Sequence, residues 1–179
     1  MTRLRCRNGP WWKLATRLLL LCLAWKLGLC GVEARAQGSG FTEYDVKAAL
    51  LAKFPQFIAW PGSRSSMTVG ILGADPFGGA LDKAFRVKRS RQVEDLKDCQ
   101  IIFVSKSERG NVGAILSSLG GTNILTVGES DGFAKQGGVI GFVMDGDKVR
   151  FEINTGAAQR SGLTIKVQLS KLAVRVFGS

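Results

Sequence analysis

Two short runs that are apolar at nearly every position constrain the fold of this chain more than any other feature. They are the segments QIIFVS at 100–105 and NILTVG at 123–128. A strand is apolar throughout when both of its faces are buried, as happens in parallel sheets that carry helices on each side. The two runs therefore predict the centre of an α/β sheet.

Other β-rich and helical segments alternate along the rest of the chain. β-rich segments lie at 67–73, 85–93, 139–145 and 148–154, and helical segments fit at about 76–84 and 108–119, with a turn near 131–136. We expect one compact α/β domain in which a mixed, mostly parallel sheet is flanked by helices.

The C-terminal part of this domain has two further features. Asp145-Gly146-Asp147 separates two β-rich segments and is typical of a β-hairpin turn. In the second strand of this hairpin, Val149, Phe151 and Ile153 alternate with charged residues and are expected to face the core. Beyond it the apolar spacing first alternates and then becomes helical, which predicts a final helix starting near Lys166.

The folded domain is expected to begin with an amphipathic helix. Thr42 and Asp45 are spaced as a capping box, in which each side chain bonds the other's backbone N–H. Apolar residues then recur at helical spacing up to Pro55, at Phe41, Tyr44, Ala48, Leu51 and Phe54.

The first 36 residues have the pattern of a secretory signal peptide. Five basic residues precede the apolar run at 18–25, and Ala34-Arg35-Ala36 is a small-x-small cleavage site. We therefore expect residues 1–36 to be a signal peptide, 37–41 a flexible leader and 42–179 the folded domain of a periplasmic protein.

Two other interpretations of this segment are considered. A retained membrane anchor needs about 20 mostly apolar residues, whereas Arg17 and Lys26 leave eight uncharged positions between them. Lipid attachment at Cys30 needs a small preceding residue, and this chain has Leu29 there.

Removal of the first 36 residues changes both the charge and the cysteine content. Seven basic residues and one acidic residue are lost, so the formal net charge falls from +11 to +5. Cys99 becomes the only cysteine, and no intrachain disulfide can form. Its place beside QIIFVS predicts a buried free thiol in an oxidising compartment.

The residue types of the chain exclude most catalytic chemistry. It has no histidine, which removes the usual general base, the catalytic triads and most zinc sites. Its glycine-rich segments match neither phosphate-loop pattern. We expect no catalytic residue, metal site or cofactor; a carboxylate mechanism at Glu129 or Asp131 is the enzymatic alternative.

Three groups of residues are candidates for binding. Arg150, Glu152 and Asn154 form a polar cluster for a ligand or partner, although Asn154 equally suits a helix cap. Two more groups could dock a protein or cover the core: the cations Arg86, Lys88 and Arg89, and the aromatic residues Phe57 and Trp60. Nucleic acid is not an expected partner of an exported protein.

The order and spacing of several segments resemble the YfiR-like periplasmic proteins. The resemblance covers nearly all of the chain after residue 36, from VKAALLAKFPQFIAWP through MTVGILGADPFGGAL, CQIIFVS and NILTVGESDGFAKQGGVIGFVMDGDKVRFEIN to AAQRSGLTIKVQLSKLA. It implies a compact α/β fold and an exported, non-enzymatic regulator.

The resemblance also implies a mode of action. Relatives bind the periplasmic sensor domain of an inner-membrane diguanylate cyclase, hold it inactive and so lower cyclic di-GMP and restrain biofilm formation; others are tied to sensor kinases. We expect such a partner and a homodimer, with a small-molecule sensor as the alternative. Relatives often carry a redox-active cysteine pair at the positions of Gly70 and Cys99, and the glycine removes that pair here.

Overall fold

The computed structural model describes residues 41–62 and 66–178. The predicted signal peptide, its cleavage site and Cys30 lie outside these residues, as does most of the predicted leader. None of the helices in the described ranges is long and apolar enough to cross a membrane.

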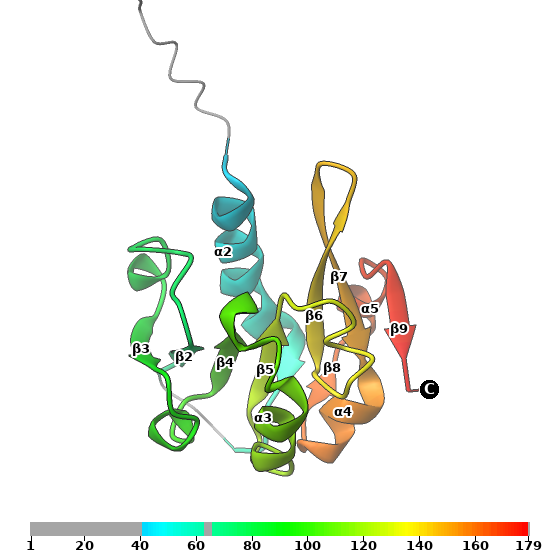
Figure 1. Cartoon of the computed structure of the whole chain (residues 1–179). Helices are drawn as coiled ribbons and strands as arrows, with labels where there is room; N and C mark the ends of the chain where they lie inside the picture. Colours follow the sequence, from blue (N-terminus) through cyan, green and yellow to red (C-terminus); the bar gives the residue numbers. More distant parts are fainter. Residues whose placement is uncertain (1–40, 63–65, 179) are drawn as a thin grey trace, which may run out of the picture. The chain divides into compact units, whose positions relative to one another are not determined.

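The centre of the domain is a seven-stranded sheet with the order β3-β2-β4-β5-β6-β7-β9 (Figure 1). Its strands are β2 (Thr68–Leu72), β3 (Arg86–Ser90), β4 (Ile101–Val104), β5 (Leu125–Gly128), β6 (Ile140–Asp145), β7 (Lys148–Asn154) and β9 (Arg175–Phe177). A second, antiparallel sheet joins β1 (Ile58–Ala59) to β8 (Thr164–Ile165). All six predicted strands are present.

The strand directions confirm the mixed, mostly parallel sheet. Every neighbouring pair is parallel except β6 and β7, which form the predicted hairpin. Asp145 pairs with Lys148, so the turn consists of Gly146 and Asp147, and Gly146 has the positive φ of +57° that this tight connection needs.

Two hydrophobic cores lie on opposite faces of the sheet because successive strand residues point in opposite directions. In β4, for example, Ile101 and Phe103 belong to one core and Ile102 and Val104 to the other. The first core also contains residues of α2, α4 and α5, and the second contains residues of α3. This explains why QIIFVS is apolar throughout.

Helix α2 (Glu43–Lys53) confirms the first predicted helix. The Thr42 hydroxyl accepts the Asp45 N–H at 3.2 Å, and the Asp45 carboxylate accepts the Thr42 N–H at 2.9 Å. This is the complete capping box, and it begins the helix where the sequence predicts. A 3₁₀ turn that includes Pro55 follows, η1 (Phe54–Phe57).

The remaining helices are short, and α3 covers only part of the helix predicted at 108–119. They are α3 (Val112–Ser118), α4 (Thr155–Arg160), α5 (Val167–Ser170) and the 3₁₀ turns η2 (Leu81–Lys83), η3 (Glu94–Leu96) and η4 (Lys106–Glu108). The helix predicted at 76–84 is wrong except for η2. Pro76, Gly78 and Gly79 occupy its first half, and Gly78 has a φ of +56°, which is incompatible with a helix.

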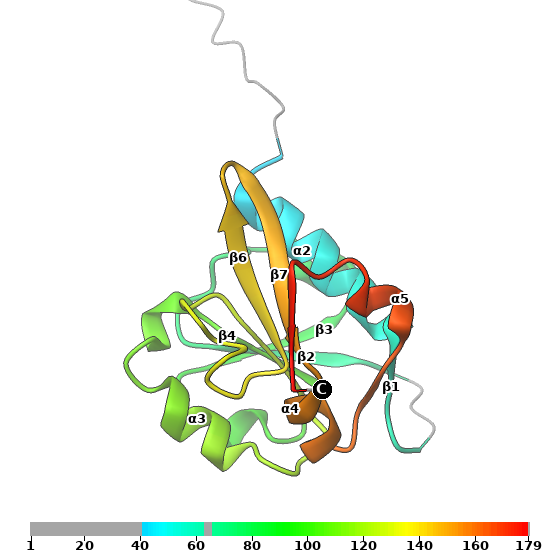
Figure 2. The same cartoon turned by 90° about the vertical axis from the view of Figure 1, so that its right-hand side faces the viewer.

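The C-terminus differs from the prediction beyond Ser170. Helix α5 starts next to Lys166, as expected, but has only four residues. The chain then reaches the sheet edge and adds β9 beside β7 (Figure 2). Strand β9 has only three residues, too few for a period-two pattern to stand out.

Candidate functional site

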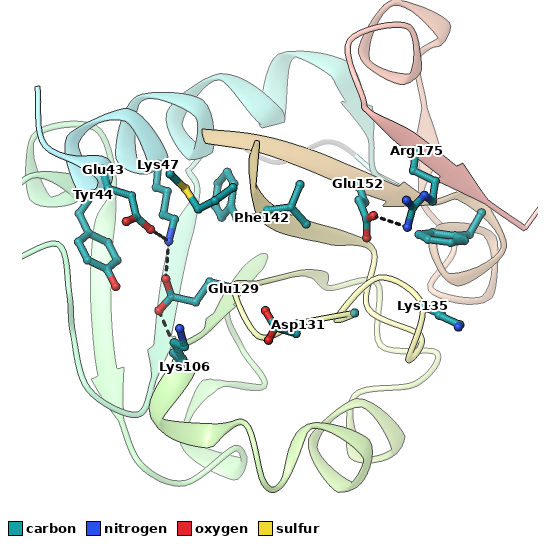
Figure 3. Close-up of a pocket in the computed structure, with 14 residues that line it drawn as sticks. Glu43, Tyr44, Lys47, Lys106, Glu129, Asp131, Lys135, Phe142, Glu152 and Arg175 are labelled. Carbon is teal, nitrogen blue, oxygen red and sulfur yellow. Dashed lines mark hydrogen bonds and ion pairs between the residues drawn. The ribbon is translucent and has the colours of Figure 1, made fainter. Parts of the chain in front are cut away.

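The main candidate site is a cavity of about 470 Å³ at the ends of the central strands (Figure 3). Residues that directly follow β4 and β5 line it, together with α2, β6, β7 and β9. The carboxyl edge of a parallel sheet is where open α/β folds bind ligands. The lining residues are Glu43, Tyr44, Lys47, Lys106, Glu129, Asp131, Gly132, Lys135, Phe142, Val143, Met144, Glu152, Arg175 and Phe177.

A buried ion pair joins α2 to the sheet on one side of this cavity. Lys47 Nζ lies 2.7 Å from Glu129 Oε2 and 2.5 Å from Glu43 Oε1. The side chains of Lys47 and Glu129 are only 5% and 3% exposed. Glu129 Oε1 also accepts the backbone N–H of Lys106 at 3.1 Å. One carboxylate therefore connects the ends of β4 and β5 to α2.

The ion pair sets the charge state of its neighbours. Burial by itself would lower the pKa of Lys47, but hydrogen bonds to Glu129 and Glu43 outweigh it and raise that pKa above 10.5. Burial, and secondly the charge of Glu129, raises the pKa of Tyr44, whose ring centroid lies 4.6 Å from Lys47 Nζ. Lys47 is therefore a fixed cation and Tyr44 a neutral phenol at neutral pH.

A second ion pair forms the opposite wall. Arg175 of β9 lies 3.1 Å from Glu152 of β7. The Glu152 side chain is 8% exposed and that of Arg175 is 66% exposed, so the pair runs from the wall to the surface. Together the two walls place charges of both signs around the aromatic residues Phe142 and Phe177.

The structure separates the three members of the predicted polar cluster. Arg150 is exposed on the hairpin, and Glu152 lies in the cavity wall. Asn154 is buried and caps α4, because its Oδ1 accepts the N–H of Ala157 at 2.7 Å. Its Nδ2 donates to the carbonyl of Ala134 at 2.8 Å. Asn154 is therefore structural, and only Glu152 lines the cavity.

The predicted cations lie on β3, which is one edge of the sheet. Arg89 is held by Asp75 at 2.6 Å and Asp82 at 2.8 Å, and Lys88 is held by Asp98 at 3.0 Å. These carboxylates neutralise much of the strand. Arg86 is exposed and forms no ion pair within residues 41–62 and 66–178.

The predicted aromatic pair lies near the end of η1 and β1. Phe57 and Trp60 are both half-buried and pack against the first core. The Trp60 indole N–H is buried and has no hydrogen-bond partner among the described residues. Both side chains thus cover the core and present only part of their surface.

Cys99 is the free, buried thiol that the sequence predicts; it is 2% exposed. Burial, and secondly the charge of Asp98, raises its pKa to about 11. A Cβ atom added to Gly70 would lie 3.2 Å from Cys99 Sγ. The positions that the family resemblance pairs are therefore adjacent in this fold.

Sequence reasoning did not identify Lys47, Tyr44 or Arg175 as site residues. A signal for Lys47 exists, because it shares a helical stripe with Tyr44, Ala48 and Leu51 and is thus a charge on an apolar face. Glu129 entered only as a catalytic candidate. Its role here is an ion pair between elements far apart in the sequence.

Among the described residues, no group of three or more potential metal-ligating side chains comes together. The cavity is lined instead by the two ion pairs and by aromatic side chains.

The sequence profile of the YfiR/HmsC-like family matches residues 44–174. The chain belongs to the YfiR/HmsC-like family. The match extends from the first turn of α2 to the residue before β9 and thus covers both the sheet and the cavity. The family is one of periplasmic, regulatory proteins of cyclic di-GMP signalling. No curated protein matches the sequence.

Two solved structures share the fold of this YfiR/HmsC-like chain. One is an ABC domain in complex with L-Trp from Streptococcus pneumonia, with a TM-score of 0.56 and 14% identity over 75% of this chain and 62% of the other. The second is a conserved domain protein from Vibrio cholerae, with a TM-score of 0.56 and 10% identity over 75% of this chain and 60% of the other. The chain thus spans less than two thirds of each.

Proposed function

We propose that this chain is an exported negative regulator of an inner-membrane diguanylate cyclase. It docks on the periplasmic sensor domain of the enzyme and holds the enzyme inactive, which lowers cyclic di-GMP and restrains biofilm formation. The observation that carries the proposal is the family match over residues 44–174. The physical mechanism is a population shift, because a protein that binds only the inactive conformation stabilises that conformation.

The docking surface that we propose combines one charged and one apolar part. Arg86 is the exposed cation of the β3 edge without an ion pair in the described part of the chain, so it can meet an acidic partner surface without first breaking a contact. Arg89 and Lys88 contribute less, since carboxylates already hold them. Phe57 and Trp60 supply the apolar part through their exposed edges.

We also propose that export removes the N-terminal segment. Residues 1–36 are the signal peptide, 37–41 the leader and 42–179 the functional domain. The intact mass of the protein recovered from the periplasm tests this, and a chain that starts at Gln37 is expected. A chain that starts at Met1, or one that carries lipid on Cys30, would refute it.

The regulatory proposal is tested by deletion and complementation in the source organism. Loss of the gene is expected to raise cellular cyclic di-GMP and surface attachment, and the wild-type gene to restore both. Arg86→Glu is expected to restore them only partly, whereas the matched control Arg109→Glu reverses another exposed charge and restores them fully. Unchanged cyclic di-GMP after deletion would end the proposal.

A second candidate function rests on the cavity. Paired charges next to Phe142 and Phe177 suit a small ligand that is both charged and aromatic, so the chain could be a ligand sensor that acts through a kinase or other partner. L-Trp, present in the similarly folded Streptococcus domain, is the first probe. Ligand-dependent thermal stabilisation of the purified protein, lost in Glu152→Ala and without effect on cyclic di-GMP, would favour this function.

A further inference from the structure

Three oxidisable sulfur atoms remain in the chain after residue 36. They belong to Met67, Cys99 and Met144, because Met1 and the other three cysteines lie within the first 36 residues. Thiols and thioethers are the side-chain groups that oxidants convert stepwise to oxygenated products. In an oxidising compartment, the fold decides which of the three atoms an oxidant can reach.

The fold protects Cys99 from oxidation and covers much of Met67. Cys99 is 2% exposed and belongs to the second core. Its raised pKa of about 11 keeps the thiol protonated, and the thiolate is the form that reacts with oxidants. Met67 directly precedes β2 and is half-buried. Neither residue presents a fully accessible sulfur atom to solvent.

Met144 differs from both because it is exposed and lies at the cavity. It is 48% exposed and is one of the residues that line the cavity. Strand β6 pairs with β5 only at Ile140 and Gly141, so from Phe142 onward its one neighbour among the described strands is β7. Met144 therefore lies on a two-stranded ribbon that extends past the other strands (Figure 1), where an oxidant reaches it from solvent.

The position of Met144 on β6 also shows that its oxidation leaves the fold intact. Side chains two residues apart on a strand point to the same face of the sheet. Phe142 lies two residues before Met144, is 3% exposed and belongs to the first core. Met144 is the next position outward on that face, where the apolar side chains reach solvent. An oxygen added to its sulfur atom therefore does not have to enter the core.

We propose that Met144 is a reversible oxidation site at the rim of the cavity and that peroxide is the oxidant. The thioether sulfur attacks one oxygen of hydrogen peroxide, and an S–O bond forms as the O–O bond breaks. The departing hydroxide takes the proton from the transferred oxygen and leaves as water. Sulfur loses two electrons and the peroxide gains them. A methionine sulfoxide reductase reverses the step, because its thiols supply two electrons and the oxygen leaves as water.

Oxidation changes the chemistry of the cavity rim. The thioether of Met144 is an apolar group, whereas the sulfoxide carries a polar oxygen that accepts hydrogen bonds. A ligand or partner that covers Met144 must remove water from this oxygen, which costs free energy unless a donor replaces the water. The oxidised chain therefore binds such an occupant more weakly. This consequence, unlike the oxidation itself, rests on the proposed regulatory function.

Peptide mass spectrometry of the exported, folded chain tests the oxidation site. Tryptic peptides 136–148 and 65–83 separate Met144 from Met67. In dilute hydrogen peroxide, the Met144 peptide is expected to gain one oxygen, about 16 Da, at least about fivefold faster than the Met67 peptide. In urea the two rates should become equal, because the selectivity comes from the fold. Equal rates in the folded chain, or an oxygen that methionine sulfoxide reductases A and B together do not remove, would overturn the proposal.

Cyclic di-GMP in living cells tests the regulatory consequence. A peroxide pulse is expected to raise cyclic di-GMP at least about twofold in cells with the wild-type gene, because the oxidised chain binds its occupant more weakly. Met144→Leu keeps the apolar volume but cannot be oxidised, so it should abolish the rise, whereas the matched control Met67→Leu should respond like the wild type. An equal rise in Met144→Leu and wild-type cells would overturn the regulatory role. A gene deletion without effect on cyclic di-GMP would instead count against the proposed function, and the peptide measurement would still decide the oxidation site.

Discussion

Introduction of a cysteine at Gly70 should create a disulfide with Cys99. The geometry supports the bond, because a Cβ on Gly70 lies 3.2 Å from Cys99 Sγ. The corresponding distance across a disulfide is about 3 Å, given an S–S bond of about 2.05 Å. The backbones of the two residues therefore need almost no movement to form the bond.

The stabilisation follows from the length of the closed loop. A loop of about 30 residues removes about 3.5 kcal/mol of chain entropy from the unfolded state. The new side chain also lies 3.2 Å from Leu96 Cβ, which is tighter than ordinary contact, and relief of this crowding costs about 1 kcal/mol. The net gain of about 2.5 kcal/mol corresponds to a rise of about 8 °C in Tm for a domain of this size.

The assay is thermal unfolding of Gly70→Cys with and without reductant. Since burial raises the pKa of Cys99 to about 11, the bond should form slowly in vitro, and the protein is best taken from an oxidising periplasm. The matched control Gly70→Ser introduces the same crowding without a bond and should melt below the wild type. Two free thiols in the folded, oxidised variant would show that Gly70 and Cys99 are not adjacent.

Three further predictions concern two buried polar contacts, the Lys47–Glu129 ion pair of the cavity and the Asn154 cap of α4. Lys47→Met should lower the free energy of unfolding by about 3–5 kcal/mol in denaturant titrations, because Glu129 is left buried without its cation. The double variant with Glu129→Gln should regain most of this stability. A loss below about 1 kcal/mol in Lys47→Met would contradict the buried pair. The folded-state pKa of Lys47 lies above 10.5, so the stabilisation by its charge is complete below pH 10.5 and is lost as the pH rises through the folded-state pKa. The difference in stability between wild type and Lys47→Met should therefore shrink as the pH rises through this range. A constant difference would show that the stabilisation does not come from the charge of Lys47. Asn154→Ala should lose both the cap on Ala157 and the donor to Ala134, at a cost of about 1–3 kcal/mol in the same titrations. An unchanged free energy of unfolding would mean that neither contact contributes to stability.

The fold was largely predictable because its signals are local. The apolar runs of β4 and β5 indicate strands buried on both faces, and the capping box at Thr42 marks the start of α2 to the residue. The errors also have local causes. Pro76 and two glycines stop the expected helix, and β9 is too short for any pattern.

The site was much less predictable because its residues are far apart in the sequence. Glu152 was a binding candidate beside Arg150 and Asn154, which the structure assigns to the hairpin surface and to a helix cap. The cations of β3 were one group in the sequence, yet Arg89 is tied to Asp75 and Asp82 by the fold. Neither division follows from the spacing of residues along one strand.

The sequence by itself determined the α/β class, six strands of the large sheet, the hairpin and the lack of histidine chemistry, because these depend on residue type and on periods of a few residues. Only the tertiary structure decided that Lys47 meets Glu129, that Arg175 meets Glu152 and that Gly70 lies against Cys99. These contacts depend on strand order and on how helices pack across the sheet. The energies that set strand order and packing are summed over the whole core, so no single segment encodes them.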